Sequence, residues 1–121
     1  MKLLIVEDNP GVRKVIRNIV ARVAPEICEC ADGAGAMDFF RLERPDFVLM
    51  DVQMQGVDGI TATRQITVAD PTARVIIVTD YDQPDLREAA YQAGACGYVL
   101  KENLLELVSL LKELAEKDGT Q

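Results

Sequence analysis

The chain has 121 residues, of which 49% are hydrophobic and 27% charged, as expected of one globular domain with a substantial core. Twenty acidic residues against thirteen basic ones give a net charge of −7, which disfavours binding of nucleic acid by this domain. The absence of histidine excludes His-based triads, His metal ligands and a phosphohistidine carrier within these residues, and no apolar run approaches the ~20 residues of a membrane helix.

Hydrophobic periodicity alternates between strand and helix along the chain. In chain order the predicted elements are strand Lys2–Val6, a helix from Pro10, strand Ile27–Cys30, helix Gly35–Glu43, strand Phe47–Met50, a helix from Asp58 to the break at Asp70-Pro71, strand Arg74–Val78, helix Pro84–Gly94, strand Gly97–Leu100 and a last helix over Leu104–Leu114. Nearly continuous apolar strands separated by helices predict a parallel sheet covered on both faces, an α/β fold.

Two finer predictions concern the first helix and the cysteines. Asn9 is expected to cap the first helix before Pro10. The buried face of this helix is predicted from residues at helical spacing: Val12, Val15, Ile16, Ile19, Val20 and Val23. The odd number of cysteines, without a Cys-x-x-Cys motif, favours small core or surface residues, with Cys28 and Cys30 on one face of a strand.

Four of the apolar runs end in polar or charged residues that rarely stay buried without a partner. These residues are Glu7-Asp8, Asp51, Thr79 and Lys101. In open α/β sheets, ligands bind beyond the carboxyl ends of the strands, where these groups would meet. Three carboxylates in one place favour a divalent cation, and Mg²⁺ prefers such oxygen ligands. The set suits phosphoryl transfer to a carboxylate, with Lys101 and Thr79 facing the phosphoryl oxygens.

Each of these residues also has a simpler interpretation. The acidic pair could form a helix-capping turn, and Asp51 could be an ordinary loop acid. Thr79 could cap the next helix, and Lys101 could be a solvated strand end. All of these residues follow or end strands of one predicted sheet, four strands in all, and this shared position favours a common site.

Several segments resemble the receiver domains of two-component response regulators. They are Val6-Glu7-Asp8-Asn9, Leu49-Met50-Asp51-Val52-Gln53-Met54, Val57-Asp58-Gly59, Val78-Thr79 and Gly97-Tyr98-Val99-Leu100-Lys101. The last segment looks most like the subgroup usually followed by a helix-turn-helix DNA-binding domain. The resemblance spans nearly the whole chain. It implies one doubly wound, flavodoxin-like domain over residues 1–117, with five parallel strands in the order 2-1-3-4-5, five helices and a frayed tail at 118–121.

The resemblance also assigns roles at the site. It implies that Asp51 is the phosphoacceptor and that Lys101 contacts the phosphoryl group. It further implies a Mg²⁺ ion held by Asp8, Asp51 and the backbone carbonyl of Gln53, with Glu7 acting mostly through water.

By the same resemblance, Thr79 and Tyr98 form a switch pair, in which the hydroxyl moves toward the phosphate and the ring turns inward. The output surface would be the fourth helix, fifth strand and fifth helix, roughly Asp85 to Leu114, facing an effector or pairing as a homodimer after phosphorylation. The donor would be a phosphohistidine on a sensor histidine kinase or phosphotransfer protein that docks on the first helix. The implied location is the cytoplasm, with no membrane or direct nucleic-acid partner. The domain would be a switch and not an enzyme, catalysing only its own phosphorylation and dephosphorylation.

Three residues depart from the family pattern. Glu7 is a permitted longer variant of the first acid, and Gln55 stands where proline is usual. Asp80 follows Thr79 where a small residue is common. Asp80 could place a fourth negative charge at the site and slow phosphorylation by small anionic donors. The alternative is that it points to solvent or, together with Asp82, caps the next helix.

Other functions remain as alternatives. A pseudo-receiver would be a protein-interaction module that needs no phosphate, and Gln55 and Asp80 are its only support. A flavodoxin would need a hydroxyl- and Gly-rich phosphate loop where Glu7-Asp8-Asn9-Pro10 stands. A phosphatase with an Asp nucleophile would carry it after the first strand with a second acid two residues on, whereas Asp51 follows the third strand and Gln53 takes the second position.

Overall fold

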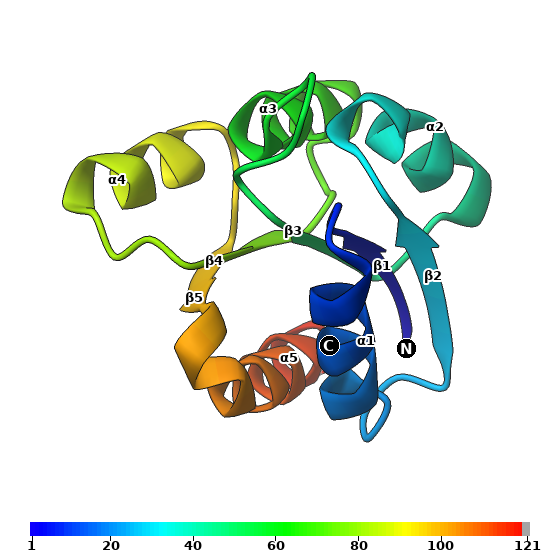
Figure 1. Cartoon of the computed structure of the whole chain (residues 1–121). Helices are drawn as coiled ribbons and strands as arrows, with labels where there is room; N and C mark the ends of the chain where they lie inside the picture. The colour runs from blue at the N-terminus through cyan, green and yellow to red at the C-terminus, as the bar shows by residue number, and fades with distance from the viewer. Residues whose placement is uncertain (120–121) are drawn as a thin grey trace.

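The computed structural model describes the backbone of residues 1–119 and side chains through Lys117. Within this range, five parallel strands form one sheet in the predicted order β2-β1-β3-β4-β5 (Figure 1). The strands are β1 (Lys2–Val6), β2 (Glu26–Cys30), β3 (Phe47–Met50), β4 (Val75–Thr79) and β5 (Gly97–Leu100). The helices are α1 (Pro10–Val20), α2 (Gly33–Glu43), α3 (Gly59–Ala69), α4 (Pro84–Gln92) and α5 (Leu104–Gly119), with a 3₁₀ turn η1 (Lys101–Asn103) before α5.

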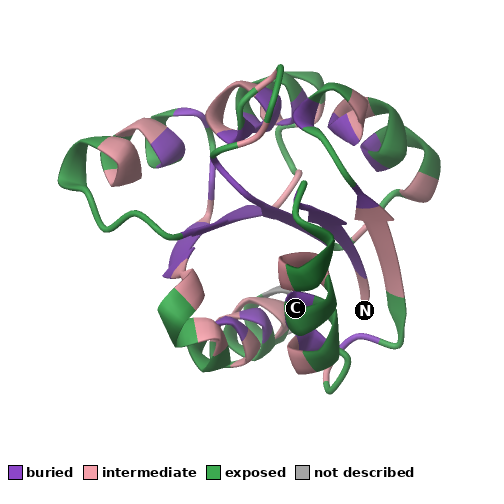
Figure 2. Cartoon of the chain, in the orientation of Figure 1, coloured by how far each residue is buried: buried purple, intermediate pink, exposed green. Residues whose placement is uncertain are grey.

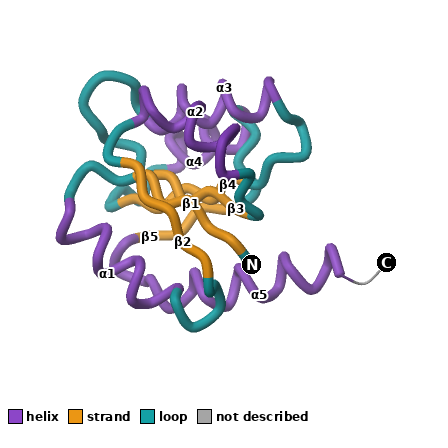
Figure 3. Tube along the Cα trace, turned by 90° about the vertical axis from the view of Figure 1, so that its right-hand side faces the viewer, coloured by secondary structure: helices purple, strands orange, loops and turns teal. Residues whose placement is uncertain are grey.

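The helices lie in two layers on opposite faces of the sheet. α2, α3 and α4 cover one face, and α1 and α5 cover the other (Figures 1 and 3). Two apolar clusters fill the spaces between the layers, one including Phe40, Ile66 and Met50 and the other Ile16, Leu111 and Leu49. β3 and β4 are buried from end to end and β1 from Leu3 onward (Figure 2), which explains their continuous apolar sequences.

Local polar contacts set the helix starts. Asn9 caps α1 as predicted, because its side-chain oxygen accepts hydrogen bonds from the N–H groups of Gly11 and Val12. α2 begins at Gly33, two residues earlier than predicted, because Asp32 caps it through the N–H of Gly35. α3 begins after Asp58, whose carboxylate accepts the N–H of Thr61. The N-terminal turn of α3 is thereby fixed beside the loop that follows β3.

Some predicted boundaries were wrong. α1 ends at Val20, so Val23 packs on the core from the turn after the helix, and Val15 is 49% exposed at the edge of the apolar stripe. β4 begins at Val75, whereas Arg74 stacks on the Phe47 ring 4.0 Å from its centroid. α4 ends at Gln92, before Gly94 with φ +104°. The turn η1 was not predicted.

Two further expectations concern the cysteines and the chain end. All three cysteines are free, and Cys28 and Cys30 both pack toward the same core cluster, as predicted. α5 continues to Gly119, and the last part of the predicted tail 118–121 lies outside the described residues, so the domain boundary stays a prediction. Across the part of the chain that the structure describes, no helix combines the length and apolarity needed to cross a bilayer.

Candidate functional site

The register of the sheet brings the acidic residues together. β1 and β3 are neighbours, with Val6 paired to Met50, so Glu7 and Asp51 are the next residues on adjacent strands. The N–H of Asp51 donates to the carbonyl of Val6 at 2.9 Å, which fixes the two strand ends against each other. The strand order reverses here, because β1 leads to β2 on one side while β3 lies on the other. This is the switch point at which open α/β sheets bind ligands.

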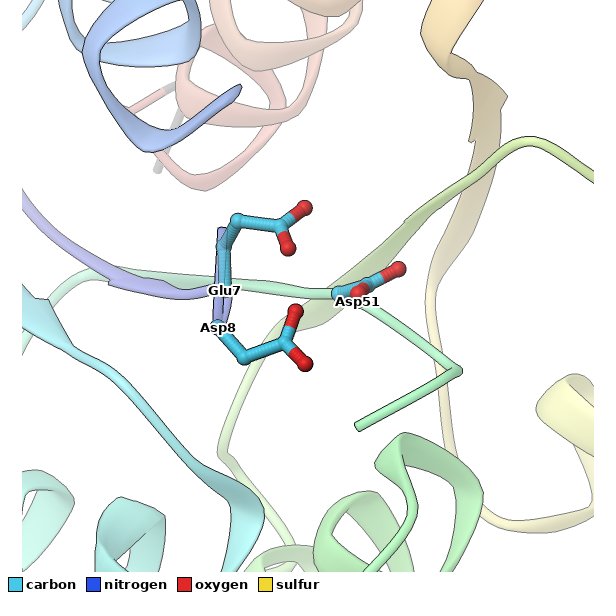
Figure 4. Close-up of side chains that lie close together, drawn as sticks. All are labelled: Glu7, Asp8 and Asp51. Atoms are coloured by element: carbon cyan, nitrogen blue, oxygen red, sulfur yellow. The ribbon is translucent and has the colours of Figure 1, made fainter. Parts of the chain in front are cut away.

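The three carboxylates form one cluster. One oxygen from each of Glu7, Asp8 and Asp51 lies within 4.8 Å of the others, and among the described residues this is the one group of at least three acids, cysteines or histidines so placed. Figure 4 shows the side chains of Glu7 and Asp8 extending from the end of β1 toward the same space as Asp51. Glu7 and Asp51 are buried, at 1% and 5% exposure, whereas Asp8 is exposed to solvent. The cluster therefore has a buried interior and an open side.

Lys101 provides the positive charge of the cluster. Its Nζ lies 2.7 Å from Glu7 Oε1 and 3.2 Å from Asp51 Oδ1. Burial by itself would lower the pKa of Lys101, but the bond to Glu7 and the charge of Asp51 outweigh it and raise that pKa. Lys101 is therefore charged at neutral pH. From its position directly after β5, it forms ion pairs with the carboxylates that follow the adjacent strands β1 and β3.

Glu7 has an unusual environment for an acid. Burial raises the pKa of its carboxyl to about 7, although the nearby ammonium of Lys101 and the hydrogen bond from the Asn9 N–H oppose this. Its Oε1 accepts no well-oriented hydrogen bond, even though the ammonium of Lys101 is close. One ammonium facing three carboxylates leaves the cluster negative, and its donors are all oxygen. This set fits a hard divalent cation such as Mg²⁺.

The loop after β3 forms the open side of the cluster. Asp8, Gln53 and Gln55 line a hollow of about 420 Å³ there. The loop is held tightly at its far end, because the Gly59 N–H donates to the carbonyl of Val52 at 2.9 Å. A Cβ on Gly59 would lie only 1.8 Å from the backbone oxygen of Asp51. The close approach of α3 thus fixes the backbone at Asp51, and Gln53 and Asp8 line the same hollow.

Thr79 is the last residue of β4, and Tyr98 lies within the neighbouring strand β5, where it pairs with Ile77. The Thr79 side chain is fully buried, and its Oγ1 accepts the N–H of Tyr81 at 3.2 Å. The Tyr98 ring is also buried, and its hydroxyl donates to the carbonyl of Tyr81 at 2.5 Å. Arg87 covers this ring, with its Cζ 4.4 Å from the ring centroid. The tyrosine is therefore inward, and both members of the predicted switch pair contact the backbone of one residue, Tyr81.

Asp80 lies at the margin of the cluster. Its Oδ2 is 3.9 Å from Lys101 Nζ, although 70% of its side chain is exposed. The helix-capping interpretations of Thr79, Asp80 and Asp82 are wrong. The N-cap residue of α4 is Gln83, and no side chain caps this helix through a hydrogen bond. Asp82 instead lies 3.7 Å from the guanidinium of Arg87. The ammonium of Lys101 is thus shared by three carboxylates, those of Glu7, Asp51 and Asp80.

Two residues at the site escaped sequence reasoning. Tyr81 joins two loops, because its hydroxyl donates to Oε1 of Gln53 at 2.8 Å while its backbone binds Thr79 and Tyr98. Arg13 donates to the carbonyl of Glu7 at 2.8 Å and to Glu29 at 3.0 Å. No periodicity predicts the path of the loop that carries Tyr81. Arg13 could have been found from its position one turn after the Asn9 cap.

The pKa of Glu7 predicts a pH-dependent affinity for Mg²⁺. A raised pKa means that protons compete for this carboxylate below about pH 7, so metal binding should weaken as the pH falls. We expect an apparent affinity about five- to tenfold lower at pH ~6 than at pH ~8, by isothermal titration calorimetry. Glu7→Gln should bind more weakly at high pH and lose most of this dependence. Equal affinities of the parent protein at both pH values would contradict the prediction.

Comparisons with known proteins agree with this geometry. The pattern of the response regulator receiver domain family matches residues 3–112. Sporulation initiation phosphotransferase F of Bacillus subtilis is 34% identical over 100 residues, which cover 83% of this chain and 81% of that protein. Response regulator GacA of Pseudomonas aeruginosa is 33% identical over 117 residues, covering 94% of this chain but only 55% of that protein.

Solved structures give the same result. A two-component response regulator of the LuxR family from Aurantimonas sp. SI85-9A1 has a TM-score of 0.87 at 34% identity, covering 93% of this chain and 83% of that one. CheY from Borrelia burgdorferi, solved with CheX, BeF₃ and Mg²⁺, has a TM-score of 0.83 at 25% identity, covering 92% and 89%. The pseudo-receiver alternative gains no support from these matches, and the predicted resemblance is confirmed. The chain belongs to the response regulator receiver domain family.

Proposed function

We propose that Asp51 accepts a phosphoryl group from a phosphohistidine on a sensor histidine kinase or phosphotransfer protein, in a Mg²⁺-dependent reaction in the cytoplasm. The observation that carries this proposal is the position of the Asp51 carboxylate. It is buried at the switch point of the sheet, 3.2 Å from the ammonium of Lys101 and beside the carboxylates of Glu7 and Asp8. A carboxylate so placed is a nucleophile with a cationic partner for the group it attacks.

The residues of the chain divide the work of the transfer. Lys101 contacts Oδ1 of Asp51, so we assign Oδ2 as the oxygen that attacks phosphorus while the bond to the donor nitrogen breaks. Asp8, Asp51 and the Gln53 carbonyl, with Glu7 mostly through water, would hold Mg²⁺, which supplies positive charge for the phosphoryl oxygens. After transfer, Lys101 can leave Oδ1 and contact a phosphoryl oxygen. Hydrolysis of the acyl phosphate by water at the open side then resets the domain slowly.

The switch is carried by Thr79 and Tyr98 through Tyr81. The Thr79 hydroxyl has a partner already, the N–H of Tyr81, and it would give up this bond for a phosphoryl oxygen. Loss of this bond would release the backbone of Tyr81, whose carbonyl accepts the Tyr98 hydroxyl. The Tyr98 ring would then settle inward in the space that the Thr79 side chain leaves, and this would change the surface of α4, β5 and α5. This surface would bind a downstream effector or a second phosphorylated copy.

Labelling with a small donor tests the proposal. Phosphoramidate, which carries a phosphorus–nitrogen bond like phosphohistidine, should label the protein in the presence of Mg²⁺ and not with a chelator. The product should be cleaved by hydroxylamine, because an acyl phosphate reacts with it and a phosphoserine does not. Labelling that survives hydroxylamine, or that needs no divalent cation, would count against this mechanism.

Asp80 is expected to slow labelling by small anionic donors. Its carboxylate faces Lys101, so it repels an incoming anion and draws the lysine away from it. Asp80→Ala should raise the initial rate of labelling by acetyl phosphate about two- to fivefold at low ionic strength, and less at high salt. Asp82→Ala is the control, since Asp82 pairs with Arg87 away from the cluster. An unchanged rate, or an equal gain in the control, ends the hypothesis.

A further inference from the structure

α2 and α3 lie side by side on the face of the sheet away from α1 and α5 (Figures 1 and 3). Residues of these two helices and of the turns that follow them line a surface groove. It consists of two adjoining hollows of about 610 and 510 Å³ that share Met37, Arg41 and Ala69. The proposed site lies elsewhere, because none of its residues lines either hollow. No residue of the proposed phosphoryl transfer therefore lines the groove.

The smaller of the two hollows is lined mainly by apolar atoms, whereas the larger one is more polar. Met37 packs on the core cluster from α2, and Val68 on α3, a residue that is 76% exposed, lines the apolar hollow. Removing an apolar side chain of this size from water is favourable. An apolar side chain of a partner could thus gain from filling these hollows.

The rim of the groove is positively charged, on a protein whose net charge is −7. Arg41, Arg44 and Arg64 line the two hollows and are exposed. Within the part of the chain that the structure describes, none of the three is in an ion pair, whereas Arg13, Arg17 and Arg87 are.

One carboxylate also lines the groove. Asp70 already accepts hydrogen bonds from the N–H and the hydroxyl of Thr72, at 3.0 and 2.6 Å. Those bonds, more than the nearby Arg44, hold its pKa below the usual value. The arginines of the rim therefore remain available to carboxylates of a partner.

We propose that the groove between α2 and α3 binds an acidic amphipathic helix of a partner protein. Apolar side chains on one face of that helix would fill the hollows, and carboxylates beside them would pair with Arg41, Arg44 and Arg64. A nucleic acid fits less well, because its phosphates would meet the acidic remainder of the surface and leave the apolar hollow uncovered. This surface is separate from α1 and from the face of α4, β5 and α5.

A peptide titration tests the proposal. The probe is a synthetic helix of about 16 residues with leucines at positions i, i+4 and i+7 and glutamates flanking them. Added to ¹⁵N-labelled protein, it should shift backbone amide resonances of α2 and α3, and a version with lysine for glutamate should not. An absence of shifts, shifts confined to other elements, equal binding of the lysine version, or tighter binding of a single-stranded oligonucleotide to these amides would overturn it.

Variants locate the contact. Arg41→Glu combined with Arg64→Glu should weaken peptide binding at least about fivefold, because two attractive charges become repulsive. Arg22→Glu combined with Lys112→Glu, at exposed residues in the turn after α1 and on α5, is the charge-matched control and should leave binding unchanged. Dispersed amide spectra would verify that each variant is folded. Equal loss in the control would overturn the proposal. Asp51→Ala should bind the peptide normally, so this test is independent of the phosphoacceptor assignment.

Discussion

Lys101→Met is expected to destabilise the metal-free protein by about 2–4 kcal/mol at pH ~8, because it leaves two buried carboxylates without their cation. The Nζ of Lys101 contacts both Glu7 and Asp51, whose side chains are only 2% and 6% exposed. Removing one partner of a buried ion pair costs more than the pair itself contributes, since the remaining charge stays desolvated. Urea unfolding followed by far-ultraviolet circular dichroism, suited to a protein without tryptophan, measures the loss.

The loss should shrink at low pH and with metal. The pKa of Glu7, about 7 in the parent protein, rises further without the lysine. Near pH ~6 the carboxylate of Glu7 in the variant therefore binds a proton, which removes its repulsion with Asp51. Mg²⁺ should restore part of the stability in place of the ammonium. Labelling by phosphoramidate should fall about a hundredfold or more. Lys112→Met, at an exposed lysine of α5, is the control. Equal losses at both pH values would refute the assigned role of Glu7.

Gly59→Ala is expected to damage the fold and the site together. The added methyl would lie 1.8 Å from the backbone oxygen of Asp51 and 2.9 Å from the Cα of Val52, and neither can move without shifting the loop after β3. We expect a loss of about 2–4 kcal/mol in the free energy of unfolding, in the upper range for overpacking. We also expect Mg²⁺ affinity to fall at least about tenfold, because the Asp51 carboxylate and the Gln53 carbonyl would lose their relative positions.

Gly56 provides a matched control in the same loop. Its φ is +80°, but nothing lies within 4 Å of an added Cβ. Gly56→Ala therefore carries backbone strain without a clash and should cost only about 1 kcal/mol. Calorimetric titration with Mg²⁺ and urea unfolding of both variants separate the two effects. If the two substitutions cost the same, the close approach of α3 is not what positions Asp51.

Much of the fold and site could be predicted because both follow from the ends of apolar runs. Parallel strands place their carboxyl ends along one edge, so Glu7, Asp51 and Lys101 were expected to meet before any register was known. The register of β1 with β3 then places Glu7 beside Asp51. The bond of Tyr98 to the carbonyl of Tyr81 could not be predicted, since it depends on a loop with no repeating pattern.

Other features depend on contacts between distant segments. Val15 has the spacing of a buried residue but sits at the edge of its stripe, because the angle at which α1 meets the sheet is set by packing. The basic groove joins Arg41 on α2 to Arg64 on α3, two residues that share no motif. The position of Asp80 is intermediate between the two predicted alternatives, near the lysine and yet exposed.

Every later step of the proposed switch depends on transfer of the phosphoryl group to Asp51. Intact-protein mass spectrometry after incubation with phosphoramidate and Mg²⁺ tests it most directly, with Asp51→Ala and Asp38→Ala treated in parallel. Asp38 is an exposed acid on α2, away from the cluster. We expect a gain of one phosphoryl mass in the parent protein and in Asp38→Ala, and no gain in Asp51→Ala. A full gain in Asp51→Ala, or none in the parent protein, would contradict it.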